Sequence, residues 1–357
     1  MALPDRLVLS LPKVHLHCHL EGTLRAPTFV ELARRDGVSL RYHPHAGEHA
    51  AFADADSGIS PDDPYRFSTF QEFLFTFAAV GRALSRVDDY ARLAREFVED
   101  ARAQNVLYGE LFISPSVWRF FHPELDVRDA VSAIVSELRA ADAEYKLIVD
   151  LTRNFGIDKA MQTAELAVSL IDLDVIGIGL GGDEARFPPE LFCDAFAFAR
   201  SYGLHCVAHA GEAADASSVR GAIEALGAER IGHGVRAVED PAVVELLVDR
   251  GVALEICPTS NFLTGAADRS RPHPFLELDR AGVAIAIDAD DPALFETSIT
   301  AEYGYVLERA GLETLERFVT SAANATFLPP EQKRELVRRV GAELAAARRT
   351  ANRNVGT

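Results

Sequence analysis

The sequence predicts an α/β protein folded as a single-domain (β/α)8 TIM barrel, and three observations support this prediction. Short apolar runs alternate with longer segments of helical spacing, eight of those runs have strand character, and 357 residues suit one such barrel. Strands that alternate with helices form parallel βαβ units, and eight of them close into a barrel. The pattern alone leaves an open doubly wound sheet as the alternative.

The eight predicted strands are short apolar runs that end at polar residues or glycine. In chain order they are Lys13–Leu20, Val106–Ile113, Tyr145–Leu151, Val175–Leu180, Leu204–Ala210, Arg230–Gly234, Val252–Cys257 and Val283–Ile287. Between most neighbours, apolar residues recur with helical spacing and stop near a glycine or a polar residue. The clearest predicted helices are Ala160–Ile171, Pro188–Tyr202, Ser218–Leu226 and Asp240–Arg250.

Three segments depart from this repeat. Residues 37–64 are rich in His, Asp, Ala and Pro, which predicts a loop inserted after the first strand and helix. Residues 67–77 are dense in Phe and are predicted to form a helix over the barrel mouth. The barrel domain is assigned to residues 1–346, and the tail 347–357 is predicted to be disordered because it lacks apolar periodicity.

Composition narrows the function classes. The chain carries 36 basic and 54 acidic side chains, a formal net charge of −18. Such a surface repels phosphate backbones and anionic lipid, so we expect neither a nucleic-acid nor a membrane partner, but a small-molecule substrate. The four cysteines form no CxxC pair and the N-terminus has no signal-peptide pattern, so we expect a cytoplasmic protein.

Residues that can bind a metal gather at the ends of four predicted strands, on the face where barrel active sites form. The first strand offers histidines on one face because strand side chains alternate with a period of two. The candidates are His15, His17 and His19, then His209 and Glu212, then His233, and finally Asp288, Asp290 and Asp291. By contrast, His205 lies four residues before His209 on the same strand and is expected to be structural.

Two histidines of the first strand, a third from across the barrel and a carboxylate form a borderline-soft N3O site. Zinc is the natural occupant, with an open position for water, although iron, cobalt or manganese fit the same ligands. A divalent metal lowers the pKa of bound water to about 7. Glu212 and His233 would complete general acid–base catalysis. The residues therefore predict metal-assisted attack of water on an electrophilic carbon.

The tetrapeptide HAGE occurs twice, and its position decides which copy belongs to the site. His209–Glu212 follows an apolar run with strand character, whereas His45–Glu48 lies in the inserted loop. Only the first of these can end a barrel strand. The loop histidines, His43, His45 and His49, are expected to be solvated.

Six motifs, in order and spanning nearly the whole chain, resemble the adenosine deaminase family. They are PKVHLHCHLEGT (12–23), GIGLGGDE (177–184), VAHAGE (207–212), RIGHG (230–234), EICPTSN (255–261) and DADDPALF (288–295). The resemblance implies a cytoplasmic hydrolase of the amidohydrolase superfamily that acts on the C–N bond of a cyclic amidine in purine metabolism.

The resemblance also implies a role for each site residue. One zinc ion would be held by His17, His19, His209 and Asp290, leaving His15 to pack lower on the strand. Glu212 would protonate the purine at N1, and His233 would orient the attacking water and stabilise the developing charge. Asp291 would form a hydrogen bond with N7 of the purine, and the backbone N–H of Gly182 would donate a hydrogen bond to N3. Phe73, Leu74 and Phe77 would face the base from a lid helix.

Departures from the family pattern affect the substrate. Glu21 stands where adenosine-specific members have the Asp that touches the ribose, and Phe112 replaces a usual Arg. Asp288 takes a place where Asn or Ser is frequent. The sequence ranks adenosine or 2′-deoxyadenosine first, a 5′-substituted adenosine such as aminodeoxyfutalosine second and free adenine third.

Two other function classes fit the sequence less well. Many barrel amidohydrolases that act on an amide or a phosphoester use a binuclear site with a bridging carboxylated lysine at the end of the fourth strand, and GIGLGGDE has no lysine. A catalytically silent binding barrel would have lost a ligand or an acid, and every one is present.

Overall fold

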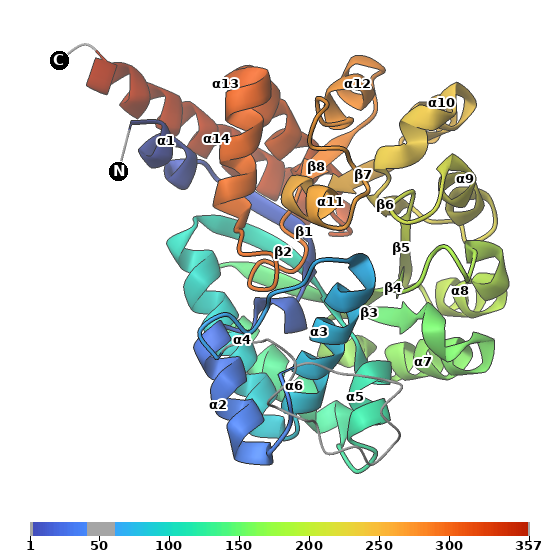
Figure 1. Ribbon diagram of the computed structural model, residues 1–357. Coiled ribbons are helices and arrows are strands. Elements are labelled where there is room, and N and C mark those ends of the chain that lie inside the picture. The colour runs from blue at the N-terminus through green and yellow to red at the C-terminus, as the bar shows by residue number, and fades with distance from the viewer. Residues whose placement is uncertain (1–2, 41–60, 356–357) are drawn as a thin grey trace.

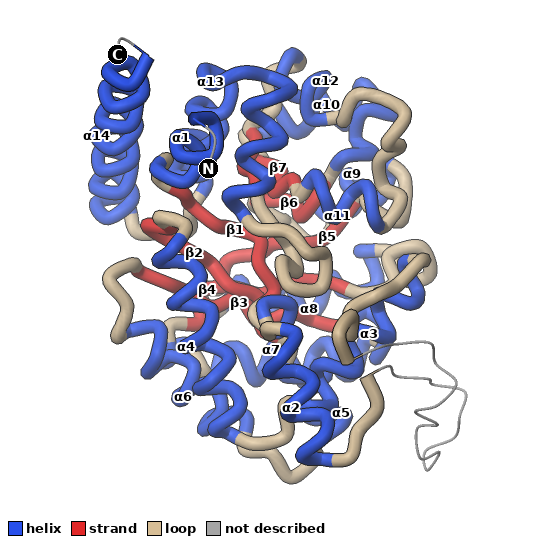
Figure 2. Tube along the Cα trace, turned by 60° about the vertical axis from the view of Figure 1, so that its left-hand side comes forward, coloured by secondary structure: helices blue, strands red, loops and turns tan. Residues whose placement is uncertain are grey.

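The computed structural model describes residues 3–40 and 61–355 of the chain, in which eight parallel strands run in chain order around a barrel (Figures 1 and 2). The barrel predicted from the sequence is confirmed. Its strands are β1 Lys13–His19, β2 Val106–Ile113, β3 Glu144–Thr152, β4 Val175–Gly181, β5 His205–Ala210, β6 Arg230–His233, β7 Ala253–Ile256 and β8 Ile285–Ile287.

The barrel closes beside the candidate metal ligands. Strand β8 is short, and the chain that follows it pairs with β1 through a bridge between Cys18 and Asp290. The backbone N–H of His19 donates to the carbonyl of Asp290 at 2.9 Å, and the N–H of Asp290 donates to the carbonyl of His17 at 3.0 Å. Closure therefore fixes the first and last strand ends against each other.

Helices surround the strands in both views (Figures 1 and 2). They are α1 Leu3–Ser10, α2 Ala26–Asp36, α3 Phe70–Ala83, α4 Val87–Ala103, α5 Pro115–Phe121, α6 Val127–Arg139, α7 Ile157–Ser169, α8 Cys193–Ser201, α9 Ala216–Glu224, α10 Pro241–Arg250, α11 Pro258–Leu263, α12 Phe275–Arg280, α13 Ile299–Ala325 and α14 Pro330–Val355. Helix α13 is interrupted at Gly311, whose φ is +82°. In the described part of the chain, no helix combines the length and apolarity needed to cross a membrane.

The barrel interior is apolar at mid-height and charged at its N-terminal end, which we call the base. Phe112, Ile148 and Val207 form the apolar cluster. Below them Arg230 is 1% exposed, with Nε 2.5 Å from Glu255 Oε1 and Nη2 2.6 Å from Glu110 Oε2, the latter contact poorly aligned for a hydrogen bond. The guanidinium stabilises both carboxylates where water cannot reach them.

Two predictions on the flanking segments need revision. The predicted lid helix over 67–77 is α3, which begins at Phe70 because the Thr69 side chain caps it by accepting from the N–H of Glu72. Residues 347–355 of the tail, which the sequence predicts to be disordered, continue α14 in the structure. Ala347 is buried and Arg348 pairs with Glu316 of α13, so the tail is tied to the neighbouring helix. The inserted loop lies mostly in 41–60, outside the described residues, as do His43, His45 and His49.

Candidate active site

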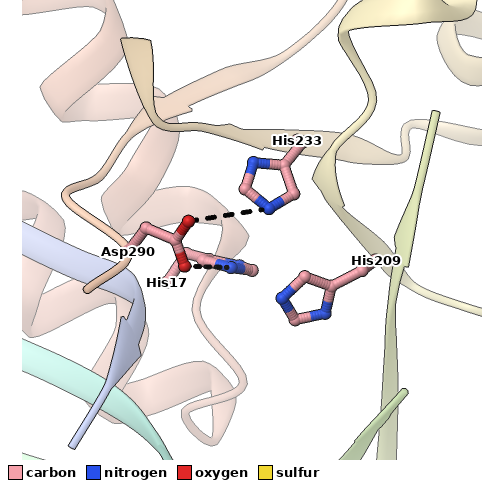
Figure 3. Close-up of side chains that lie close together, drawn as sticks. All are labelled: His17, His209, His233 and Asp290. Atoms are coloured by element: carbon pink, nitrogen blue, oxygen red, sulfur yellow. Dashed lines mark ion pairs between the residues drawn. The ribbon is translucent and has the colours of Figure 1, made fainter. Parts of the chain in front are cut away.

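Side chains from strand ends across the barrel converge on one point at its C-terminal face, which we call the mouth (Figure 3). The ligand atoms of His17, His209, His233 and Asp290 all lie within 4.8 Å of one another. Asp290 Oδ1 lies 3.4 Å from His17 Nε2 and 3.5 Å from His19 Nε2. His19 Nε2 lies 3.1 Å from His209 Nε2. The ligand set expected from the sequence is therefore brought together.

This cluster fits a divalent metal. His17 Nε2 is buried without a hydrogen-bond partner among the described residues. Burial lowers the pKa of His19 to about 3 and lowers that of His209, which keeps these imidazoles neutral and able to ligate. Three imidazole nitrogens and a carboxylate suit zinc and related divalent ions. His233 lies close enough to belong to the same ligand group.

Partners behind the cluster orient it. Glu255 Oε2 lies 2.8 Å from Nδ1 of His17, so Nε2 is the nitrogen turned toward the site. His209 Nδ1 is 3.1 Å from the carbonyl of Leu180, which orients that ring in the same way. The Ser260 hydroxyl donates to Asp290 Oδ2 at 2.7 Å. Glu255 was not among the site residues expected from the sequence, although an acidic residue inside the apolar run VALEIC indicates a buried carboxylate with a specific partner.

Glu212 and His233 face each other beside this cluster. His233 Nε2 lies 3.6 Å from Glu212 Oε2 and 3.9 Å from Asp290 Oδ2. Asn261 Nδ2 lies 3.0 Å from His233 Nδ1, so a donating amide would place the imidazole proton on Nε2. Burial raises the pKa of Glu212 to about 8, and the charges of Asp290 and Glu184 add to that shift. A carboxylic acid and a neutral imidazole therefore flank the cluster.

The loop that carries Glu212 is held by Glu184. One carboxylate oxygen accepts from the N–H of Gly211 at 2.6 Å, and the other accepts from three further N–H groups at 2.7–3.1 Å, those of Glu212, Ala213 and Ala214. The sequence analysis quoted Glu184 only as part of GIGLGGDE. Its position between β4 and β5 lets a single side chain fix the backbone of the proposed acid.

Two glycines permit close approach at the mouth. A Cβ on Gly22 would overlap the carboxylate of Asp291, so only glycine allows that side chain its position beside β1. Gly182 has a φ of +99°, and a Cβ there would overlap the Asn154 side chain. One oxygen of Asp291 is buried without a partner among the described residues. The expected N7 and N3 contacts, Asp291 and Gly182, thus occupy tightly packed positions.

Glu21 is held by the protein itself. Its Oε1 accepts from the Ser114 N–H at 2.8 Å and from the Trp118 indole N–H at 2.7 Å. The carboxyl is 1% exposed, and burial raises its pKa to about 7. Two hydrogen bonds therefore anchor Oε1 at the start of α5, while Oε2 is buried without a hydrogen-bond partner among the described residues.

The three predicted lid residues are not equivalent. Phe77 lies over the cluster, with its ring centroid 6.0 Å from that of His19. Phe73 is buried and stacks on Phe295 at 4.8 Å, and Leu74 is half-buried. Among them, Phe77 has the measured contact with the cluster.

The remaining candidates on the first and last strands serve packing. His15 Nε2 accepts from the Ala289 N–H at 3.3 Å, and Asp288 Oδ1 accepts from the Leu16 N–H at 2.6 Å. Both residues are buried below the cluster. Phe112 lies 4.9 Å and 5.0 Å from the rings of His17 and His19, closing the site from below.

Comparisons with known proteins agree with this geometry. The family model described as adenosine deaminase matches residues 12–343. The chain is 34% identical to an adenine deaminase of Paraburkholderia phytofirmans over 95% of each protein.

Two solved structures extend the comparison. The zinc-bound cog1816 amidohydrolase from Burkhoderia ambifaria is similar at a TM-score of 0.85 and 26% identity, covering 99% of this chain and 95% of that one. The N6-methyl-AMP deaminase of Arabidopsis thaliana is similar at a TM-score of 0.80 and 26% identity, covering 95% and 98%. The chain therefore belongs to the adenosine deaminase family and is a hydrolytic deaminase that acts on a C–N bond.

Proposed function

We propose that the protein exchanges the 6-amino group of a purine for oxygen from water, releasing ammonia, and that free adenine is its substrate. The observation that carries the proposal is the pairing of Glu212 with His233 beside the cluster of His17, His209 and Asp290. An acid, an imidazole and a metal-ligand set on one point are what hydrolysis of an amidine carbon requires.

Similarity favours adenine over the nucleoside ranked first by the sequence. The relative from Paraburkholderia phytofirmans is named an adenine deaminase and matches end to end. The Glu21 carboxyl, which would meet a ribose, already accepts hydrogen bonds from Ser114 and Trp118. A free base needs no partner at that position. Adenosine as the substrate is not confirmed.

The cofactor we propose is one zinc ion per chain, held by His17, His19, His209 and Asp290. A divalent metal in this site would lower the pKa of a water molecule to about 7 and so supply the nucleophile. The neighbouring Burkhoderia ambifaria structure holds zinc, and the N3O donor set of this chain suits the same ion.

The protein side chains would manage the remaining proton and charge movements. Glu212 would deliver a proton to N1 of the purine, which makes C6 electrophilic; the resulting carboxylate would then take the proton of the hydroxyl added at C6 and pass it to the departing amine as the C6–N bond breaks. His233 would stabilise the oxygen that adds to C6 through its Nε2–H. Asp291 and the Gly182 N–H would orient the ring through N7 and N3. Phe77 would cover the bound base and exclude water.

Ammonia release by the purified, zinc-loaded protein tests the proposal. The panel is adenine, adenosine, 2′-deoxyadenosine, a 5′-substituted adenosine and AMP, with guanine as a negative control. We expect turnover of adenine above all the others. Ammonia from none of the 6-aminopurines would reject the reaction, whereas turnover of adenosine alone would reject the substrate.

A second candidate substrate is a 6-aminopurine carrying a large group on N9. The structural similarity to the N6-methyl-AMP deaminase of Arabidopsis thaliana favours it. A 5′-substituted adenosine, the second choice from the sequence, belongs to the same class. Turnover of AMP or of the 5′-substituted adenosine above adenine in the same panel would select this alternative.

A further inference from the structure

Asp150 is an acidic residue of the barrel interior to which the reaction above gives no role. It lies near the C-terminal end of β3, two residues after Ile148. Side chains alternate along a strand, so the two share a face, and Ile148 belongs to the interior cluster with Phe112 and Val207. Asp150 therefore faces the inside of the barrel, one step nearer the mouth than that cluster.

Glycines of β4 make room for this carboxyl group. Asp150 is paired in register with Gly179, and a Cβ on Gly179 would lie 2.8 Å from Asp150 Oδ1. A Cβ on Gly181 would lie 2.5 Å from Asp150 Oδ2. The carboxyl thus lies directly against the backbone that leads into Gly182, whose N–H is expected to meet N3 of the purine.

Nothing in the described part of the chain hydrogen-bonds to this carboxyl. The residue is 5% exposed, and Oδ1 is enclosed without a partner. The nearby Arg153 donates instead to the carbonyls of Phe187 and His209. Burial raises the pKa of Asp150 to about 8, and the charge of Glu21 adds to that shift. A buried acceptor without a donor costs free energy, which a ligand N–H would recover.

The geometry of a purine indicates which of its N–H groups can donate to Asp150. C6 and N3 are opposite corners of the six-membered ring, and N9 is joined to C4 next to N3. With C6 at the cluster, N3 at Gly182 and N1 at Glu212 after β5, N9 lies on the other side of N3, which is the side of β3 because β3 and β5 flank β4 in the barrel. We propose that Asp150 accepts a hydrogen bond from N9–H of the free base and thereby selects free 6-aminopurines over N9-substituted ones.

This inference rests on the proposed function and assigns Asp150 the part that decides the substrate class. The other carboxyl groups at the mouth have different tasks. Glu212 is placed for N1, Asp291 for N7, and Glu21 is engaged by Ser114 and Trp118. An N9 substituent would remove the donor and leave Asp150 buried and unpaired, a loss that strongly disfavours the wrong substrate.

The test compares adenine with 9-methyladenine in zinc-loaded wild type, Asp150→Ala and Asp150→Asn. We expect wild type to prefer adenine by roughly 100-fold or more in kcat/KM. Asp150→Ala should lose most of that adenine rate, and its rate on 9-methyladenine should stay within a few-fold of wild type, so that the preference disappears. Asp150→Asn keeps an acceptor oxygen and should retain part of the preference.

Asp174→Asn is the matched control, because that half-buried carboxylate at the opposite end of the β3–β4 pair binds Arg139 and Lys146 and should leave the preference unchanged. Zinc content and thermal unfolding of each variant report whether the fold is intact. Equal losses on both substrates in Asp150→Ala, or a wild type indifferent to the methyl group, would overturn the inference. A wild type that deaminates no 6-aminopurine would instead overturn the proposed function, and the inference with it.

Discussion

The base and the mouth of the barrel both contain buried charged groups, but the base joins an arginine to two carboxylates, whereas the mouth gathers imidazoles and carboxyl groups around one point. At the base, Arg230 contacts Glu255 at 2.5 Å and Glu110 at 2.6 Å, and its guanidinium lies 3.7 Å from the centre of the Phe327 ring. At the mouth, by contrast, His17 Nε2 has no hydrogen-bond partner among the described residues. The base therefore carries its own cation, whereas the mouth presents imidazole nitrogens and a carboxylate in an arrangement that suits a bound metal ion.

This difference distinguishes the charged groups at the base, which stabilise the barrel, from the groups at the mouth, which are available to bind a ligand. The desolvation free energy of a buried charge is offset when an opposite charge of the same chain lies next to it. The desolvation penalty of a buried polar atom without a hydrogen-bond partner remains until a ligand supplies that partner. Glu255 joins the two ends, since one carboxylate oxygen meets Arg230 and the other meets His17. Through Glu255, the ion pair at the base therefore orients His17, one of the expected metal ligands at the mouth.

The largest expected effect is on stability, from Arg230→Met at the base. Removing the guanidinium leaves Glu110 and Glu255 buried without their cation, so we expect a loss of about 3–5 kcal/mol in the free energy of unfolding. Urea unfolding of the metal-free protein measures it. As a control, Arg220→Met removes exposed pairs with Glu224 and Asp240 and should cost no more than about 1 kcal/mol. Equal, small losses would show that the base does not hold the barrel.

The next effect is on catalysis, from Glu212→Gln at the mouth. The amide cannot supply the proton, so kcat on adenine should fall at least about 100-fold. Stability and zinc content should stay close to wild type, because Glu212 is outside the expected ligand set. Ammonia release and elemental analysis measure the two. A rate near wild type would remove the proposed acid, and Glu224→Gln on the surface of α9 is the control.

Zinc should stabilise the protein through the mouth alone. At 100 times its Kd, zinc is expected to raise the stability of wild type by about 2.7 kcal/mol. His209→Ala should abolish this gain. His205→Ala should keep it, since that residue on the same strand stacks on Phe327 and pairs with Glu229 at the base. Thermal unfolding with and without zinc gives both values, and a loss of the gain in both variants would contradict the assignment.

The smallest expected effect is the contribution of Glu302 to the pH dependence of stability. This carboxyl is buried and accepts from the Thr259 N–H and the Thr297 hydroxyl but pairs with no cation among the described residues, and burial raises its pKa above the usual 4.5. The unfolded chain ionises first, so its contribution to stability is full below about pH 4.5 and is lost as pH rises through the folded pKa.

Glu302 is expected to contribute at most about 1.4 kcal/mol per pH unit to the slope, and Glu302→Gln should reduce the slope by no more than that amount, because Glu21, Asp150 and Glu212 keep their own contributions. Urea unfolding between pH 4 and pH 8 measures the slope in both proteins. The comparison with Glu255 explains the sign: burial opposes ionisation there too, but Arg230 and His17 hold the pKa of Glu255 below its usual range. An unchanged slope in the variant would mean that another group sets it.

Local pattern determined much of this protein. Apolar runs and helical spacing predicted all eight strands with boundaries close to those observed, because each strand needs only its own alternation of side chains. The same rule put the metal-ligand candidates at the barrel mouth, since parallel strands bring their C-terminal ends to one face. That rule named His15, His17, His19, His209, Glu212, His233, Asp288, Asp290 and Asp291 as candidates, and the resemblance to the adenosine deaminase family selected His17, His19, His209 and Asp290 among them as the expected metal ligands.

Only the tertiary structure decided which groups share a partner. Glu255 and His17 are 238 residues apart, so no local pattern links them. Glu21 was expected to contact substrate, but the N–H of Ser114, which precedes α5, and the indole of Trp118 within α5 donate to its Oε1. Residues 347–355 continue α14, and Arg348 pairs there with Glu316 of α13. The position of the Asp150 carboxyl against Gly179 and Gly181 of β4 is likewise visible only in the folded structure. A pattern records spacing along the chain, whereas pairing and burial depend on contacts that exist only after the barrel has closed.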